Sequence, residues 1–211
     1  MKHLAVFISG TGSNLQAVID AIESGRLRDT GISVVVSNRK GAPGLERAQR
    51  HGIPTIYHPH LPYRQRGLAR EDYDRDLVAL LEPFAIDLVV LAGWMRIFSL
   101  EFLHHYPRVL NIHPALPGTF PGMHAIEEAY AAYRRGEIPE TGVMVHWAPD
   151  EAVDSGPVVM SQAVPILAED TLEALESRVH SVEHEIYVRA IAQVLGVTLE
   201  DASSSERERP G

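Results

Sequence analysis

Residues 4–14, LAVFISGTGSN, decide the fold of this chain, because five apolar residues run directly into a loop with two glycines. A run that is apolar at every position predicts a strand buried on both faces of a sheet. Apolar residues then recur at helical spacing from Leu15 to Ile22 and predict a helix over residues 14–24. A strand, a glycine loop and a helix in this order form the first unit of a parallel α/β sheet.

The rest of the chain continues the alternation of strands and helices. Further strands are expected at residues 32–36, 88–91, 109–112, 143–147 and 158–164, and further helices at residues 44–50, 71–82 and 172–195. This order predicts an α/β fold with a doubly wound, Rossmann-like, mostly parallel sheet flanked by helices. We expect a single domain over residues 1–200 and a disordered tail over 201–211, which is rich in Ser, Glu and Arg.

Composition excludes several classes of function. The 211 residues contain no cysteine, which excludes disulfides, thiolate metal sites and a cysteine nucleophile. A net charge of -9 without a long basic run argues against nucleic acid as a partner. The first residues form too short an apolar run for a signal peptide, and no run reaches transmembrane length, so we expect a cytoplasmic protein without a membrane partner. Composition does not decide between a monomer and a homodimer.

The glycine loop predicts a phosphate site. Gly10 and Gly12 allow a tight turn and a close approach of the backbone, and Ser13 and Asn14 open the helix, whose N-terminus favours an anion. A dinucleotide site is disfavoured, because its third glycine would fall at Leu15. A plain turn between a strand and a helix is the alternative without a ligand.

A second set of polar residues follows the strand at residues 109–112. Asn111 and His113 are two positions apart, so in an extended strand they point the same way and can hydrogen-bond one carbonyl oxygen. A carboxylate partner would favour the charged imidazole. Asp154 is the preferred candidate, with Asp150 and Glu151 as alternatives. A capping or packing role for His113 is the competing interpretation.

Seven segments together carry a resemblance to a known family. They are residues 8–17, 35–38, 45–48, 90–97, 110–114, 154–158 and 183–187, with sequences ISGTGSNLQA, VVSN, LERA, VLAGWMRI, LNIHP, DSGPV and EHEIY. In this order they resemble the phosphoribosylglycinamide formyltransferases, over roughly residues 3–195. The resemblance implies transfer of a formyl group from 10-formyltetrahydrofolate, as co-substrate, to the amine of glycinamide ribonucleotide in purine synthesis, without a metal.

The resemblance also implies roles for individual residues. It assigns the substrate phosphate to Gly12, Ser13 and Asn14, and contact with the glycinamide substrate to Glu183. It implies a catalytic trio of Asn111, His113 and Asp154. The folate-binding residues that it implies are Arg70, Met95, Arg96, Ile97, Phe98 and Asn111. One segment departs from the family pattern, because residues 115–122, ALPGTFPG, lack the basic residue that many members carry there.

Rival functions are weaker. Methionyl-tRNA formyltransferase and formyltetrahydrofolate deformylase look similar but carry an added domain, which we do not expect within 211 residues. His180–His184, HSVEH, matches a short zinc-peptidase pattern, but only 27 residues (211 minus 184) remain to supply a third ligand. A nucleotide-binding module without catalysis is the third alternative.

Overall fold

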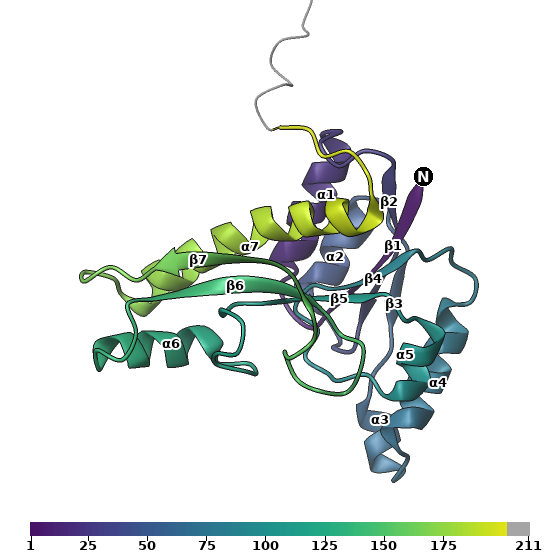
Figure 1. The fold of residues 1–211 in the computed structure, drawn as a ribbon. Helices are drawn as coiled ribbons and strands as arrows, with labels where there is room; N and C mark the ends of the chain where they lie inside the picture. The colour runs from purple at the N-terminus through teal and green to yellow at the C-terminus, as the bar shows by residue number, and fades with distance from the viewer. Residues whose placement is uncertain (202–211) are drawn as a thin grey trace, which may run out of the picture.

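A computed structural model of the chain describes residues 1–201 (Figure 1). The strands are β1 (Lys2–Ile8), β2 (Thr30–Ser37), β3 (Thr55–Tyr57), β4 (Leu88–Leu91), β5 (Val109–His113), β6 (Glu140–Trp147) and β7 (Val158–Pro165). The helices are α1 (Ser13–Glu23), α2 (Pro43–Arg50), α3 (Leu61–Gln65), α4 (Arg70–Leu81), α5 (Leu100–His105), α6 (Ala125–Arg134) and α7 (Leu172–Leu195).

The strands form one seven-stranded sheet in the order β3-β2-β1-β4-β5-β6-β7. The pairs from β3 to β5 are parallel, and β6 and β7 add antiparallel strands at one edge. The chain leaves β1 in one direction toward β2 and β3, and later continues from β4 in the other. A crevice is expected outside the carboxyl ends of β1 and β4, where the winding reverses. The prediction of a mostly parallel, doubly wound sheet is confirmed.

Residues of β1 alternate between two cores, one on each face of the sheet. Leu4, Val6 and Ile8 belong to the cluster that includes residues of α1 and α7. Ala5 and Phe7 belong to the other cluster, which includes residues of α4 and α5. Both faces of the parallel region are therefore covered, which explains why β1 is apolar at every position. In Figure 1, β6, β7 and α6 project from this region, and α7 lies along them.

Four elements are not predicted from the sequence. Strand β3 has three residues and helices α3 and α5 have five and six, too few to give a clear periodicity. Helix α6 follows the Pro- and Gly-rich segment and buries four residues, three of them alanines. Of the tail expected over residues 201–211, residues 202–211 lie outside the described part of the chain.

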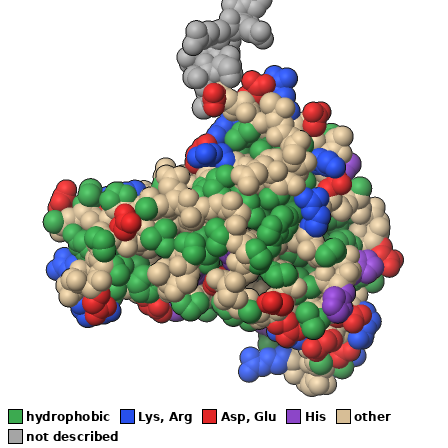
Figure 2. All heavy atoms as spheres, viewed as in Figure 1, with side chains coloured by type: hydrophobic (Ala, Val, Ile, Leu, Met, Phe, Trp, Pro, Cys, Tyr) green, Lys and Arg blue, Asp and Glu red, His purple; other side chains and the backbone are tan. Residues whose placement is uncertain are grey.

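The surface agrees with an acidic chain of mixed charge. Figure 2 shows acidic and basic side chains interspersed with apolar ones over the face that it presents. Within residues 1–201, no helix is both long enough and apolar enough to cross a membrane.

A buried tyrosine fastens α7 to the sheet beside the expected crevice. The Tyr187 side chain is fully buried, and its hydroxyl lies 2.9 Å from the Leu91 carbonyl oxygen and 3.0 Å from that of Leu110. Leu91 is the last residue of β4, and Leu110 lies within β5 directly before Asn111. The hydroxyl therefore helps to set the spacing of the strand ends.

We predict that Tyr187→Phe lowers the free energy of unfolding by about 1–3 kcal/mol, because it leaves buried carbonyl groups without a donor. Urea denaturation measures the loss. Tyr133→Phe is the matched control, since the Tyr133 hydroxyl has no hydrogen-bond partner within residues 1–201, and we expect a change below about 0.5 kcal/mol. Equal effects of the two substitutions would contradict this role of Tyr187.

Candidate active site

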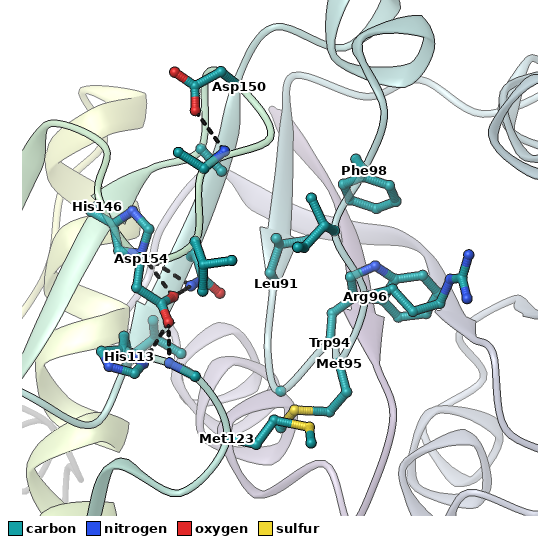
Figure 3. A pocket seen from close by; sticks show the side chains of 18 of the residues that line it. Leu91, Trp94, Met95, Arg96, Phe98, His113, Met123, His146, Asp150 and Asp154 are labelled. Atoms are coloured by element: carbon teal, nitrogen blue, oxygen red, sulfur yellow. Dashed lines mark hydrogen bonds and ion pairs between the residues drawn. The ribbon is translucent and has the colours of Figure 1, made fainter. Parts of the chain in front are cut away.

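A cavity of about 540 Å³ opens at the carboxyl ends of β4 and β5. The segment after β4, the end of β5, and the loop between β6 and β7 contribute its walls. In Figure 3, His113, His146 and Asp154 lie on one side of the cavity, and Trp94, Met95, Arg96 and Phe98 lie on the other. The cavity therefore has a polar wall and a largely apolar wall.

Asp154 is the centre of the polar wall. One carboxylate oxygen accepts a hydrogen bond from Asn111 Nδ2 at 3.1 Å, and the other accepts from the Gly122 backbone N–H at 3.0 Å. His113 Nδ1 lies 3.3 Å from Oδ2, and His146 Nε2 lies 3.6 Å from Oδ1. Burial alone would raise the pKa of Asp154, but His146, the Gly122 N–H and His113 together hold it below the ordinary value. Asp154 therefore stays ionised at neutral pH.

His113 is buried and engaged at both ring nitrogens. Its Nε2 lies 2.9 Å from the carbonyl oxygen of Phe120, which only accepts hydrogen bonds, so Nε2 carries a proton. Donation from Nδ1 to Asp154 requires a second proton on the ring. The imidazolium is the form that satisfies both contacts.

His146 is a residue of this site that the sequence analysis missed. The Trp147 carbonyl lies 2.8 Å from His146 Nδ1 and places a proton there, so Nε2 accepts a hydrogen bond from Asn111 Nδ2 at 3.0 Å. The two N–H groups of the Asn111 amide are thus directed to His146 and Asp154. The pairing of β5 with β6 brings Asn111 opposite His146, and this register was not predicted.

The other acidic candidates lie elsewhere. Asp150 accepts a hydrogen bond from the Ala152 N–H at 2.9 Å. Glu151 forms an ion pair with Arg70 and accepts from the Leu100 N–H at 3.1 Å, which ties the loop after β6 to the starts of α4 and α5. Of the three candidate carboxylates, it is Asp154 that the structure brings to His113.

Residues 115–122, the segment that lacks the basic residue of many family members, contact the polar wall through their backbone. The Phe120 carbonyl and the Gly122 N–H supply the contacts to His113 and Asp154. Phe120 adopts a left-handed conformation, with φ of 43°, which is uncommon for a bulky residue. This segment therefore contacts the polar wall through two main-chain groups.

The predicted folate residues form the opposite wall. Arg70, Met95, Arg96, Ile97 and Phe98 all line the cavity. Phe98 is buried, whereas Met95 and Ile97 remain nearly half exposed. The Met95 N–H donates to Ser9 Oγ at 3.0 Å, which joins this wall to the end of β1. An apolar wall with a few polar groups beside it is typical of a pocket for a small organic molecule.

The glycine loop lies outside the residues that line this cavity. Gly12 has φ of 72°, and a Cβ atom there would lie 2.8 Å from Gly44 Cα. Packing against Gly44 of α2 therefore requires a glycine at position 12 whether or not a ligand binds there. For this reason Gly12→Val would disturb the fold. A Cβ atom added at Gly10 would meet no other atom within 4 Å. A substitution at Gly10 is therefore the better way to probe a bound anion.

The histidine pair at residues 180 and 184 is not part of a metal cluster. Among residues 1–201, no group of three or more His, Cys, Asp or Glu side chains is arranged to hold a metal ion. His180 Nε2 lies 3.7 Å from Glu183, which is itself buried.

Comparison with known proteins identifies the family. Residues 2–191 match the family model described as formyl transferase. The chain is 48% identical over 203 residues to phosphoribosylglycinamide formyltransferase of Schizosaccharomyces pombe, covering 92% of this chain and 98% of the relative. It is 42% identical to the Escherichia coli enzyme of the same name, covering 90% and 85%. The chain belongs to the phosphoribosylglycinamide formyltransferase family.

The same conclusion comes from solved structures. Glycinamide ribonucleotide transformylase 1 of Geobacillus kaustophilus matches with a TM-score of 0.84 and 39% identity, covering 93% of this chain and 100% of that one. The family predicted from the seven sequence segments is therefore confirmed.

In this formyltransferase, Glu183 of α7 lies beside the glycine loop. The residue is 5% exposed, and its carboxyl group interacts with the Asn14 side chain at the start of α1. Burial raises the pKa of Glu183 to about 7, although the hydrogen bond from Asn14 acts in the opposite direction. Two predicted substrate-binding residues, 169 positions apart (183 minus 14), thus meet in the structure.

This raised pKa predicts how stability depends on pH. Between the ordinary pKa of 4.5 and about 7, folded Glu183 holds a proton that the unfolded chain has lost, so the free energy of unfolding falls as pH rises. The full penalty above pH 7 is on the order of 3 kcal/mol. We expect Glu183→Gln, which is neutral at every pH, to unfold at a higher temperature than the wild type at pH 8 and to lose this part of the pH dependence. An unchanged slope in calorimetric scans from pH 5 to 8 would contradict the raised pKa.

Proposed function

We propose that this chain transfers the formyl group of 10-formyltetrahydrofolate to the amine of glycinamide ribonucleotide, with Asn111, His113 and Asp154 as its catalytic residues. The observation that carries the proposal is the convergence of an amide, an imidazole and an ionised carboxylate at one end of a cavity with an apolar wall. The apolar wall takes the folate ring system. Gly12, Ser13, Asn14 and Glu183 bind the ribonucleotide.

The reaction is acyl transfer without a protein nucleophile. The substrate amine nitrogen attacks the formyl carbon, and a C–N bond forms as negative charge develops on the formyl oxygen. The Asn111 amide and the His113 imidazolium donate hydrogen bonds to that oxygen. The bond from the formyl carbon to N10 of the folate then breaks. The attacking nitrogen loses one proton and N10 gains one, so the protons balance.

Asp154 has two tasks in this scheme. Its charge keeps the His113 ring protonated, which makes the imidazole a charged donor to the developing oxyanion. Its second task in the scheme is to pass the proton between the reacting nitrogen atoms through a water molecule. The formyl oxygen takes the position that the Phe120 carbonyl occupies beside His113 Nε2, so in this scheme that carbonyl turns away when both substrates are bound.

The assay that tests the function uses purified protein with glycinamide ribonucleotide and 10-formyltetrahydrofolate. We expect formylated ribonucleotide and tetrahydrofolate in equal amounts, without ATP or added metal. Turnover that required formate and ATP instead would refute the proposal and point to a different route to the same product. Omission of either substrate is the control.

We predict that Asp154→Asn and His113→Ala each lower kcat by about 10²- to 10³-fold, because each removes the charged donor from the transition state. Affinity for the folate should change much less. The double variant should be no more than about threefold worse than the worse single one, since the two residues act as a unit.

Asp150→Asn is the matched control for these measurements. Asp150 also lines the cavity and belongs to the same loop, but its hydrogen bond goes to the Ala152 N–H. We expect its kcat to stay within about threefold of the wild type. Additive losses in the Asp154 and His113 cycle would mean independent roles and would refute the coupled trio.

A further inference from the structure

A buried serine at the end of β1 lies between the two proposed substrate sites. Ser9 is 4% exposed, and in the described part of the chain it does not belong to the residues that line the cavity. Its backbone N–H donates to the Gly93 carbonyl oxygen at 2.9 Å, and its hydroxyl oxygen accepts from the Met95 N–H at 3.0 Å. These two bonds hold the turn after β4, where the apolar wall begins. Ser9 is also directly followed by Gly10, the first glycine of the glycine loop.

The side chain of Asn38 fixes the orientation of the Ser9 hydroxyl. Asn38 follows β2 and is buried, and its Oδ1 atom accepts the hydroxyl proton, with 2.7 Å between the two oxygen atoms. A serine hydroxyl has one proton to donate. Because this proton points to Asn38, the lone pairs of the Ser9 oxygen are available to the Met95 N–H. The hydroxyl is therefore a directed contact within a small buried network.

The glycine loop is held on the other side of Ser9. The Gly10 carbonyl oxygen accepts from the Gly44 N–H of α2 at 3.2 Å, and Gly12 approaches Gly44 closely. The loop is thus fixed against α2, while the turn after β4 is fixed against Ser9. Ser9 therefore sets the spacing between the glycine loop and the apolar wall.

We propose that Ser9, oriented by Asn38, is a positioning residue for formyl transfer. The inference rests on the proposed function, which places the ribonucleotide on the glycine loop and the folate against the apolar wall. The amine and the formyl carbon belong to different ligands, so they meet at reacting distance only if the two sites keep their spacing. A misplacement of about 1 Å costs about 10²-fold in rate. Ser9 acts through the Met95 backbone and touches neither reacting atom.

Ser9→Ala tests the proposal, because it leaves the Met95 N–H without its acceptor. With both substrates saturating, we expect the single-turnover rate of formyl transfer to fall by about 10²-fold. The dissociation constant of glycinamide ribonucleotide, measured by titration calorimetry without folate, should stay within about threefold, since the glycine loop keeps its contacts with Gly44. A loss that falls on the rate and spares this affinity separates positioning from general damage to the fold.

Asn38→Ala tests the second member of the pair. It removes the acceptor of the Ser9 proton, and we expect the single-turnover rate to fall by about 5- to 10-fold. In the double variant with Ser9→Ala, the rate should stay within about threefold of that of Ser9→Ala alone, because Asn38 acts through the Ser9 hydroxyl. Losses that multiply in the double variant would overturn the role of Asn38 in orienting Ser9.

Thr30→Val is the matched control. Thr30 is also buried, and its hydroxyl donates to the Arg28 carbonyl oxygen at 2.9 Å, but it opens β2 at the opposite end of that strand from Asn38. Thr30→Val and Ser9→Ala should both lower the urea midpoint, while Thr30→Val keeps the single-turnover rate within about threefold of the wild type. Equal rate losses in the two variants, or a wild-type rate in Ser9→Ala, would overturn the positioning role. Neither result bears on the proposed function, which turnover of the wild type tests by itself.

Discussion

The need to stabilise the negative charge of one largely buried carboxylate, Asp154, organises the candidate active site. Asp154 is largely withdrawn from water, and an ionised group in that position needs donors close by. They come from Asn111 and His113 at the end of β5 and from the Gly122 N–H in the loop that follows β5, while His146 on β6 accepts from the same Asn111 amide that donates to Asp154. The antiparallel strand β6 is thus more than an extension of the sheet. Its register sets His146 opposite Asn111, and the loop that follows it returns the chain to the same point with Asp154.

The parallel part of the sheet supplies the fixed frame for this network. Strands β1, β4 and β5 are buried on both faces, so their carboxyl ends are held by packing from two layers of helices. Tyr187 adds a polar tie from α7 to β4 and β5 immediately before the segments that bear the site. On the other side of the cavity, Glu151 joins the Asp154 loop to Arg70 and to the start of α5. The two walls are therefore connected through side chains as well as through the sheet.

What the sequence predicts, and what it does not, follows from the range of the interactions. The strand at residues 4–8 and the shared orientation of Asn111 and His113 are local properties of an extended, apolar segment, and both can be read from spacing. The contact between His113 and Asp154 spans 41 positions (154 minus 113), and it was inferred from chemistry and family resemblance instead. His146 was missed because its place depends on the register between two strands. The backbone contacts of Phe120 and Gly122 depend on the left-handed backbone conformation of Phe120, which could not be predicted from the sequence pattern.

The resting network also bears on how binding energy is used. Both donors proposed for the oxyanion already have acceptors in the protein, since Asn111 donates to His146 and Asp154, and His113 donates to the Phe120 carbonyl. Exchange of one neutral carbonyl oxygen for another, from Phe120 to the formyl group, yields little net free energy in the ground state. As the amine attacks, the formyl oxygen gains negative charge, and a hydrogen bond from the imidazolium to it becomes much stronger than the one to Phe120. The arrangement therefore discriminates between the ground state and the transition state. In the proposed reaction, affinity for the substrates comes from the apolar wall and the glycine loop, while the gain at the polar wall appears in kcat.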